Sequence, residues 1–230
     1  MLRGVKKVLG YKVSSNEGRC GVVHDFLFDD RFWKLSHLVV RISLPQKSLR
    51  LFQLSAKTPA TAIAEANTLM LKANSSAILS SPSIEANPPV CRQRKQELSK
   101  LKTGVTSHSN DQPDFPSSGQ LTPVPMNPSS PNPSTPESAK EETRWNPHLR
   151  SVREVIGYRI RAQDGRAGVL EDLISDEFDF SIRYLVVRTQ RFLLRKRVIA
   201  TPIEVKGISW DTATVDVSMD RRALRQRHSV

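Results

Sequence analysis

The chain has 230 residues, with 35 Lys and Arg against 23 Asp and Glu and a net charge of +12, a length that fits one or two small domains. No apolar stretch follows the basic N-terminal residues, so we expect no signal peptide, and no apolar run approaches the roughly 20 residues that cross a bilayer. The only cysteines, Cys20 and Cys91, favour a reducing compartment over a disulfide framework. We therefore expect a cytoplasmic location, with a peripheral position on the inner membrane as the alternative.

An internal repeat organises the sequence. Residues 8–41 recur as residues 155–188 without a gap, and 13 of the 34 aligned positions are identical, where unrelated segments would share roughly two or three. We interpret the repeat as two copies of one small domain. A domain of about 80 residues buries only about 60% of its unfolded surface and gains from packing on another.

The first copy reads as a series of strands. A strand is predicted over 7–13, and Gly18 supplies the positive φ of the turn that follows. The next strand, over 19–28, contains Gly21, which predicts a bulge or sharp bend. Residues 35–42 are apolar on both faces, as in a central strand. The same signals recur in the second copy, which adds a closing hairpin over 207–217.

Between the copies the composition changes. Residues 94–101 fit a short helix, and residues 102–143 contain eight Pro and eight Ser with few apolar side chains, which predicts a disordered linker. We expect an all-β architecture with the following boundaries: a first domain over 1–93, a short helix and linker over 94–143, a second domain over 144–220, and a basic C-terminal tail over 221–230.

The positive charge lies in the two copies. Residues 1–72 carry 12 basic and 5 acidic side chains, and residues 144–230 carry 17 and 11. Basic domains favour acidic partners such as nucleic acid, anionic lipid or an acidic protein face.

Motifs that would indicate catalysis, a metal or a cofactor do not occur in the sequence. Asp25 and Asp29, repeated as Asp172 and Asp176, point to the same face if the strand runs straight. They read as turn and strand-end acids, with a cation site as the alternative. We therefore predict no catalytic residues, no metal and no cofactor.

Partner contact is predicted for a small set of side chains. Trp33 and Phe180 occupy equivalent loop positions, where they serve either as packing and domain-contact residues or as partner anchors. The basic run of the second copy gives the remaining candidates: Arg191, Arg195, Lys196 and Arg197.

The motifs of the repeat resemble the PRC-barrel family. They are Gly-Tyr at 157–158, Asp-Gly at 164–165, Gly-Val-x-x-Asp at 168–172 and Leu-Val-Val at 185–187. The family includes the cytoplasmic barrel of the photosynthetic reaction centre H subunit and the C-terminal domain of the ribosome maturation factor. The resemblance implies two six-stranded barrels in tandem. The basic stretch after residue 187 departs from the Gly- and Trp-containing hairpin usual in the second barrel.

These features predict a non-catalytic interaction or assembly module that binds a protein partner. Two alternatives follow from the resemblance: a reaction-centre-associated subunit that supports electron transfer, and an RNA- or ribosome-associated factor with a basic surface. We also expect the two barrels to pair within the chain, because a duplicated domain inherits the self-complementary contact of an ancestral homodimer and the linker keeps the encounter intramolecular.

Overall fold

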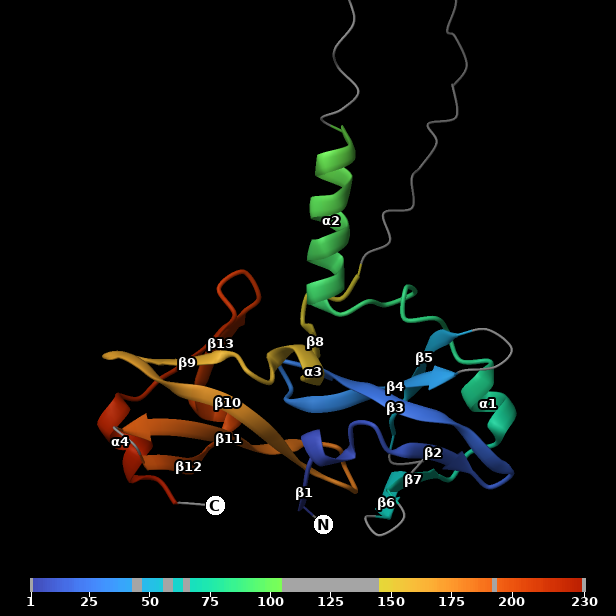
Figure 1. The fold of residues 1–230 in the computed structure, drawn as a ribbon, viewed down its shortest axis with the longest axis horizontal. Coiled ribbons are helices and arrows are strands. Elements are labelled where there is room, and N and C mark those ends of the chain that lie inside the picture. The colour runs from blue at the N-terminus through green and yellow to red at the C-terminus, as the bar shows by residue number, and fades with distance from the viewer. Residues whose placement is uncertain are drawn as a thin grey trace, which may run out of the picture. The chain divides into compact units, whose positions relative to one another are not determined.

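The fold is described from a computed structural model, which describes residues 2–42, 47–55, 60–63, 67–104, 145–191 and 194–228 (Figure 1). The described residues of Met1–Lys95 and Trp145–Val230 form one compact unit that contains both copies, and the next unit begins at Gln96. The part of the predicted linker from residue 105 to 143 lies outside the described residues. Within the described ranges, no helix combines the length and apolar character that crossing a bilayer requires.

The first copy folds into a sheet with the strand order β5-β4-β3-β2-β7-β6, drawn in blue and cyan in Figure 1. Neighbouring strands are antiparallel except for β2 and β7, which run parallel. Its strands are β2 (Lys12–Ser15), β3 (Gly18–Asp29), β4 (Lys34–Ile42), β5 (Ser48–Gln53), β6 (Ala60–Ile63) and β7 (Thr68–Leu71).

The second copy repeats this topology with the order β12-β11-β10-β9-β14-β13, and β14 runs parallel to β9. The predicted hairpin over 207–217 is present as β13 and β14. The strands of this sheet are β9 (Arg159–Ala162), β10 (Gly165–Asp176), β11 (Ile182–Arg191), β12 (Leu194–Ala200), β13 (Val205–Ser209) and β14 (Thr214–Val217).

A seventh strand joins each sheet from the other copy. Strand β1 (Leu2–Gly4) pairs with β10, and strand β8 (Leu149–Ser151) pairs with β3, both antiparallel. Leu2 lies opposite Asp176, as Leu149 lies opposite Asp29, so the two pairings follow the same register. The expected pairing of the copies within the chain is confirmed, and it is a reciprocal exchange of entry strands.

The closed barrels expected from the resemblance are not present. In the described residues the outer strands β5 and β6 do not pair with each other, nor do β12 and β13, so each sheet stays open. Helix α1 (Ser75–Leu79) instead contacts β3 and β5, and helix α4 (Arg221–Gln226) contacts β10 and β12. Each helix contributes one fully buried side chain, Ile78 in α1 and Leu224 in α4. A helix therefore covers apolar surface that pairing of the two outer strands would cover in a closed barrel.

The remaining helices are short, apart from one. Helix α2 begins four residues before the helix predicted over 94–101. Residues 221–226 of the predicted tail form α4, and the Ala223 amide in its first turn donates to the Asp220 side chain. The other helical segments are η1 (Lys6–Val8), α2 (Val90–Gly104), α3 (Val152–Val155) and η3 (Pro202–Glu204).

The predicted bulges occur at equivalent places. The register shifts between Arg19 and Gly21 in β3 and between Arg166 and Gly168 in β10. A Cβ on Gly21 would lie 2.6 Å from the Arg41 carbonyl oxygen, and one on Gly168 would lie 2.5 Å from that of Arg188. Both copies therefore need glycine here, because the neighbouring strand passes too close for any side chain.

Candidate interaction site between the two copies

The loops that follow β3 and β10 meet where the copies exchange strands. Trp33 and Phe180 both adopt positive φ, at 51° and 60°, which is unusual for bulky residues. Reciprocal backbone bonds hold them: the Leu35 amide donates to the Phe180 carbonyl at 2.8 Å, and the Ile182 amide donates to the Trp33 carbonyl at 2.7 Å. We call residues 30–33 and 177–181 the paired loops.

Asp25 links the first sheet to the N-terminus of α3. Its buried carboxylate accepts hydrogen bonds from the Ser151 hydroxyl, from the Arg153 amide at 2.9 Å and from its own neighbour's amide, that of Phe26, at 2.8 Å. Burial raises the pKa of Asp25 to about 6, against the lowering effect of these hydrogen bonds. The carboxylate thus caps a helix of the other copy.

Asp172 occupies the equivalent place in β10. It accepts from the Lys6 amide at 2.8 Å and from the Leu173 amide at 2.7 Å, and burial raises its pKa. Gly4 takes the place of Ser151 on this side, so no hydroxyl reaches the carboxylate. The capping of η1 by Asp172 repeats the capping of α3 by Asp25 with one hydrogen bond fewer.

An arginine in the middle of each exchanged strand forms an ion pair with the other copy. The Arg150 Nε donates to Asp30 at 2.6 Å, and His148 Nδ1 lies 2.8 Å from the other oxygen of that carboxylate. Arg3 pairs with Glu177 at the equivalent position. Both pairs bridge the two copies and are partly shielded from solvent, with side chains at most 23% exposed in the two arginine pairs.

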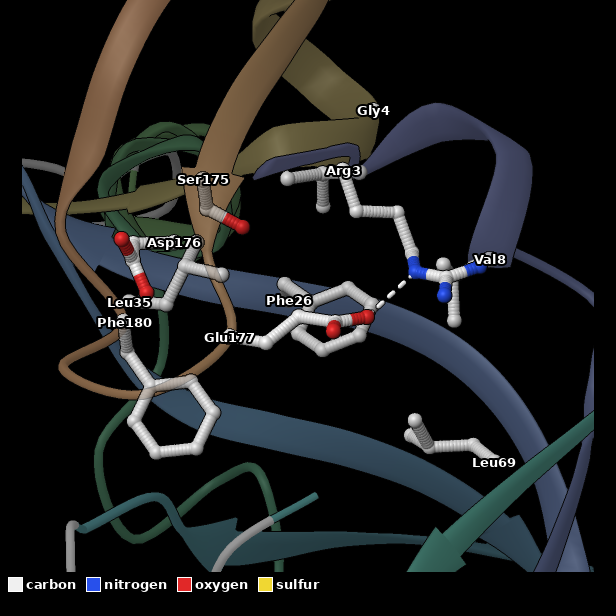
Figure 2. Close-up of a pocket in the computed structure, with 11 residues that line it drawn as sticks. Arg3, Gly4, Val8, Phe26, Leu35, Leu69, Ser175, Asp176, Glu177 and Phe180 are labelled. Carbon is white, nitrogen blue, oxygen red and sulfur yellow. Dashed lines mark hydrogen bonds and ion pairs between the residues drawn. The ribbon is translucent and has the colours of Figure 1, made fainter. Parts of the chain in front are cut away.

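A small pocket of about 40 Å³, partly open to solvent, lies beside β1 (Figure 2). Apolar side chains from the first copy form much of its wall, and the end of β10 with its loop forms the rest. The residues that line it are Arg3, Gly4, Val5, Val8, Phe26, Leu35, Leu69, Ser175, Asp176, Glu177 and Phe180.

Two phenylalanines project from the paired loops into solvent. Phe32 is 73% exposed and Phe178 is 79% exposed, and the Arg31 guanidinium stacks over the Phe32 ring at 5.1 Å. Large aromatic side chains are seldom left exposed to this extent, because burial of each ring is favourable by a few kcal/mol. The paired loops thus carry an apolar surface.

Trp33 and Phe180, predicted from sequence as partner contacts, lie at the junction of the copies. Phe180 is only 4% exposed and lines the pocket, and Trp33 is partly buried against the core. The rings of Trp33 and Phe28 lie 5.6 Å apart. Phe180 is therefore reachable only through the pocket.

The predicted basic contacts lie elsewhere, on β11 and β12. Lys196 Nζ donates to the Arg225 carbonyl at 3.0 Å, at the C-terminal end of α4, and Arg197 pairs with Glu171 at 2.8 Å. The backbones of Arg191 and Arg195 belong to the two strands, but their side chains fall outside the described residues. The structure does not bring Lys196 or Arg197 to the paired loops.

The predicted pair of acids on one face does not form a shared site. Asp25 contacts the α3 terminus, whereas Asp29 binds the Arg31 side chain at 2.8 Å, and this hydrogen bond lowers the pKa of Asp29 to about 2. Among the residues that the structure describes, no cluster of three or more His, Cys, Asp or Glu side chains is placed to hold a metal ion.

Sequence reasoning missed Phe32, Phe178 and the capping role of Asp25 and Asp172. A signal existed for the acids, because Asp25 and Asp172 are identical in the two copies although the polar residues directly before them, His24 and Glu171, differ. The phenylalanines carry no such signal, since Phe32 aligns with Asp179 and Phe178 with Arg31.

Comparison with known proteins adds no assignment. No protein-family model matches the chain, and no curated protein is significantly similar to it.

Proposed function

We propose that this chain is a non-catalytic interaction module, built from two PRC-barrel-like domains, that binds a protein partner through the paired loops. The observation that carries the proposal is the pair of exposed phenylalanines, Phe32 and Phe178, on loops that accept backbone hydrogen bonds from strands of the other copy. Exposed aromatic side chains on a rigid support are typical of the centre of protein interfaces.

The charges around the loops suit a protein surface. Residues 29–34 carry two acidic and two basic side chains, and the Arg31–Asp29 pair holds one cation beside Phe32. A mixed polar rim around an apolar centre is the usual arrangement of a protein–protein interface. The described basic side chains of β12 have internal partners, which gives no support to the nucleic-acid alternative.

The test is affinity capture from a lysate of the native host by the full chain, with quantification of the proteins enriched. The double variant Phe32→Ser, Phe178→Ser is expected to lose at least tenfold of the enrichment of a specific protein, because loss of two aromatic anchors costs well over 1.4 kcal/mol of binding. Ile203→Ser is the matched control, since Ile203 is 92% exposed on η3 and is not part of the paired loops.

The proposal is wrong if Ile203→Ser lowers the enrichment as much as the double variant does, or if the double variant keeps the wild-type partner. Urea unfolding of all variants accompanies the capture, and the double variant is expected to match the wild type within about 0.5 kcal/mol, as surface substitutions usually do.

A further inference from the structure

The two sheets differ in what covers their outer faces, the faces turned away from the main core. In the first copy this face carries a small apolar cluster of its own, whose members are at most 5% exposed: Leu27, Val39, Leu51, Leu149 and Ile84. The first four residues belong to β3, β4, β5 and β8, whereas Ile84 lies in the segment after α1. We call residues 82–85 the covering segment, because its Ile84 side chain closes the outer face of the first sheet.

The covering segment is bound along the outer edge of β5. The Leu51 amide donates to the Pro82 carbonyl at 2.8 Å. The Ile84 amide donates in turn to the Leu49 carbonyl at 3.0 Å, so the covering segment acts as a short additional strand. This domain therefore takes up an extended segment through two backbone hydrogen bonds and one buried aliphatic side chain.

The outer face of the second sheet is apolar at the same register positions. The residues that correspond, in order, to Leu149, Leu27, Val39 and Leu51 are Leu2, Ile174, Val186 and Ile199. Leu2 is 48% exposed against 1% for Leu149, and the two isoleucines are partly exposed, whereas their counterparts are buried. Among the described residues, none of the four belongs to a buried apolar cluster. Exposed apolar surface of this kind marks an interaction site.

The outer edge of β12 begins the same pairing and does not complete it within the described residues. The Ile199 amide donates to the His228 carbonyl at 3.4 Å, in the place of the first bond of the covering segment. No described amide donates to the Arg197 carbonyl, the equivalent of the second acceptor. Residues 229–230 lie outside the described residues. An outer strand with free backbone groups favours the addition of an extended segment.

Basic side chains border this face. Arg188 lies two residues beyond Val186 in β11, and alternation therefore places it on the outer face. Arg197 lies opposite Arg188 in the register, and both are exposed. Glu171 pairs with Arg197 at 2.8 Å, and its pKa is lowered by Arg197 first and then by Arg188. One described carboxylate thus serves two arginines, so an incoming acidic segment suits this face better than a basic one.

We infer that the outer face of the second sheet binds an extended acidic segment of the protein partner, which lays an aliphatic side chain over the exposed apolar residues and pairs with the edge of β12. The covering segment supplies the template, because it presents Ile84 followed by Glu85. Leu2 lies opposite Asp176, two residues before Phe178, so the face continues toward the paired loops. The inference rests on the proposed function and adds a second contact to it.

The first experiment uses a capped peptide with the sequence of residues 82–90, titrated into the isotope-labelled full chain and followed by amide NMR shifts. We expect saturable shifts at Ile174, Val186 and Ile199, with a dissociation constant on the order of a millimolar, because a short peptide loses much conformational freedom on binding. A peptide with Ile84→Ser is expected to bind at least tenfold more weakly, because it loses the burial of the aliphatic side chain. Shifts confined to the first sheet would mean that the peptide only displaces the covering segment, which overturns the inference.

Variants of the second sheet test the face itself. Ile199→Asp places a charge on the apolar face and is expected to abolish peptide binding, and Leu2→Ser, at an exposed position, is expected to weaken it about fivefold. Leu79→Ser is the matched control, because Leu79 is 44% exposed on α1 of the first copy, and is expected to bind like the wild type. Binding that is unchanged in Leu2→Ser and in a folded Ile199→Asp, or absent in the wild type, overturns the inference. If the peptide binds only after residues 229–230 are removed, the chain's own C-terminal residues cover the face, which also overturns it.

The second experiment links the face to the partner. Ile199→Asp is expected to lower enrichment of the captured protein at least fivefold, and the peptide at saturation is expected to compete with that protein. If the peptide binds but neither change affects capture, the inference is wrong while the proposed function stands. If Ile199→Asp loses the partner but the double variant Phe32→Ser, Phe178→Ser keeps it, the proposed site at the paired loops is wrong and the outer face alone binds. If Ile199→Asp instead abolishes concentration-dependent self-association in sedimentation, the occupant is a second copy of the chain, which overturns the inference.

Discussion

The contact of β8 with β3 and the contact of β1 with β10 share one register, but their side chains differ at equivalent positions. On the first contact, Ser151 caps α3 and binds Asp25, and Phe28 fills the core. On the second, Gly4 and Ser175 stand at these places and leave a pocket. The first contact is filled by buried side chains, whereas the second is less tightly packed and contains a pocket that is partly open to solvent.

This difference shows how equivalent contacts in a duplicated domain diverge. The backbone exchange, the caps from Asp25 and Asp172 and the two bridging ion pairs hold the copies together on both sides. Because both contacts hold the copies together, we expect side-chain substitutions at one contact to lower the free energy of unfolding only modestly. We expect removal of equivalent side chains to change the free energy of unfolding by different amounts at the two contacts. At the bulge glycines, where the neighbouring backbone leaves no room for a side chain, we expect equal changes.

The largest expected difference comes from the two capping acids. Asp25→Ala leaves the Arg153 and Phe26 amides and the Ser151 hydroxyl without their acceptor, and we expect it to lower the free energy of unfolding by about 3 kcal/mol at pH 5. Asp172→Ala leaves only the Lys6 and Leu173 amides, nearer to solvent, and should cost about 1 to 2 kcal/mol. Urea unfolding of the full chain, followed by tryptophan fluorescence, measures both; equal losses would contradict the asymmetry.

The sequence predicted the local parts of this arrangement and not the contacts between distant ones. Most strands, the turn at Gly18 and the bulge at Gly21 depend on side-chain alternation and backbone freedom, which short segments record. The strand predicted over 7–13 was wrong over its first half, because residues 6–8 form η1 and β2 begins only at Lys12. The parallel pairing of β2 with β7 and the exchange of β1 and β8 depend on which edges meet after folding. Closed barrels are implied by the resemblance, and the hydrophobic pattern of a sheet does not correct that expectation, because it does not reveal whether a strand or a helix covers the open side.

The site was predictable only in part for the same reason. Equivalence of Trp33 and Phe180 placed them correctly at a shared loop position, but their burial follows from the contact between copies. The small pocket lies beside Ser175, whose difference from Phe28 becomes informative only once the two residues are seen in the same register.

A smaller effect is expected from pH. Because burial raises the pKa of Asp25 from 3.8 to about 6, the folded chain favours the protonated acid. The resulting stabilisation is complete below about pH 4 and is lost as the pH rises through 6. Relative to Asp25→Asn, which does not titrate, the free energy of unfolding of the wild type should fall on the order of 2 kcal/mol between pH 4 and 7.

Urea unfolding of both proteins at several pH values measures this difference. The comparison cancels the contribution of Asp172, whose pKa is also raised, and of His24, whose pKa is lowered by burial and then by Arg153. Asp29 has the opposite sign, but with a pKa of about 2 its contribution is lost below the pH range used. If the free energy of unfolding of the wild type instead rises with pH relative to that of Asp25→Asn, the assignment of Asp25 as a buried acid with a raised pKa is contradicted.

The smallest expected effect should be the same in both copies. Gly21→Ala and Gly168→Ala each place a methyl group within 2.6 Å of a neighbouring carbonyl oxygen, and backbone atoms cannot rotate away as a side chain does. We expect each to lower the free energy of unfolding by about 1.5 kcal/mol, the usual cost of overpacking, and to agree within about 0.5 kcal/mol. Gly207→Ala is the control, because its Cβ meets nothing within 4 Å, and should change stability by less than about 0.5 kcal/mol. Clearly unequal losses at Gly21 and Gly168 would mean that the copies differ in their backbone packing as well, and the contrast between the two contacts would then extend beyond side chains to the scaffold itself.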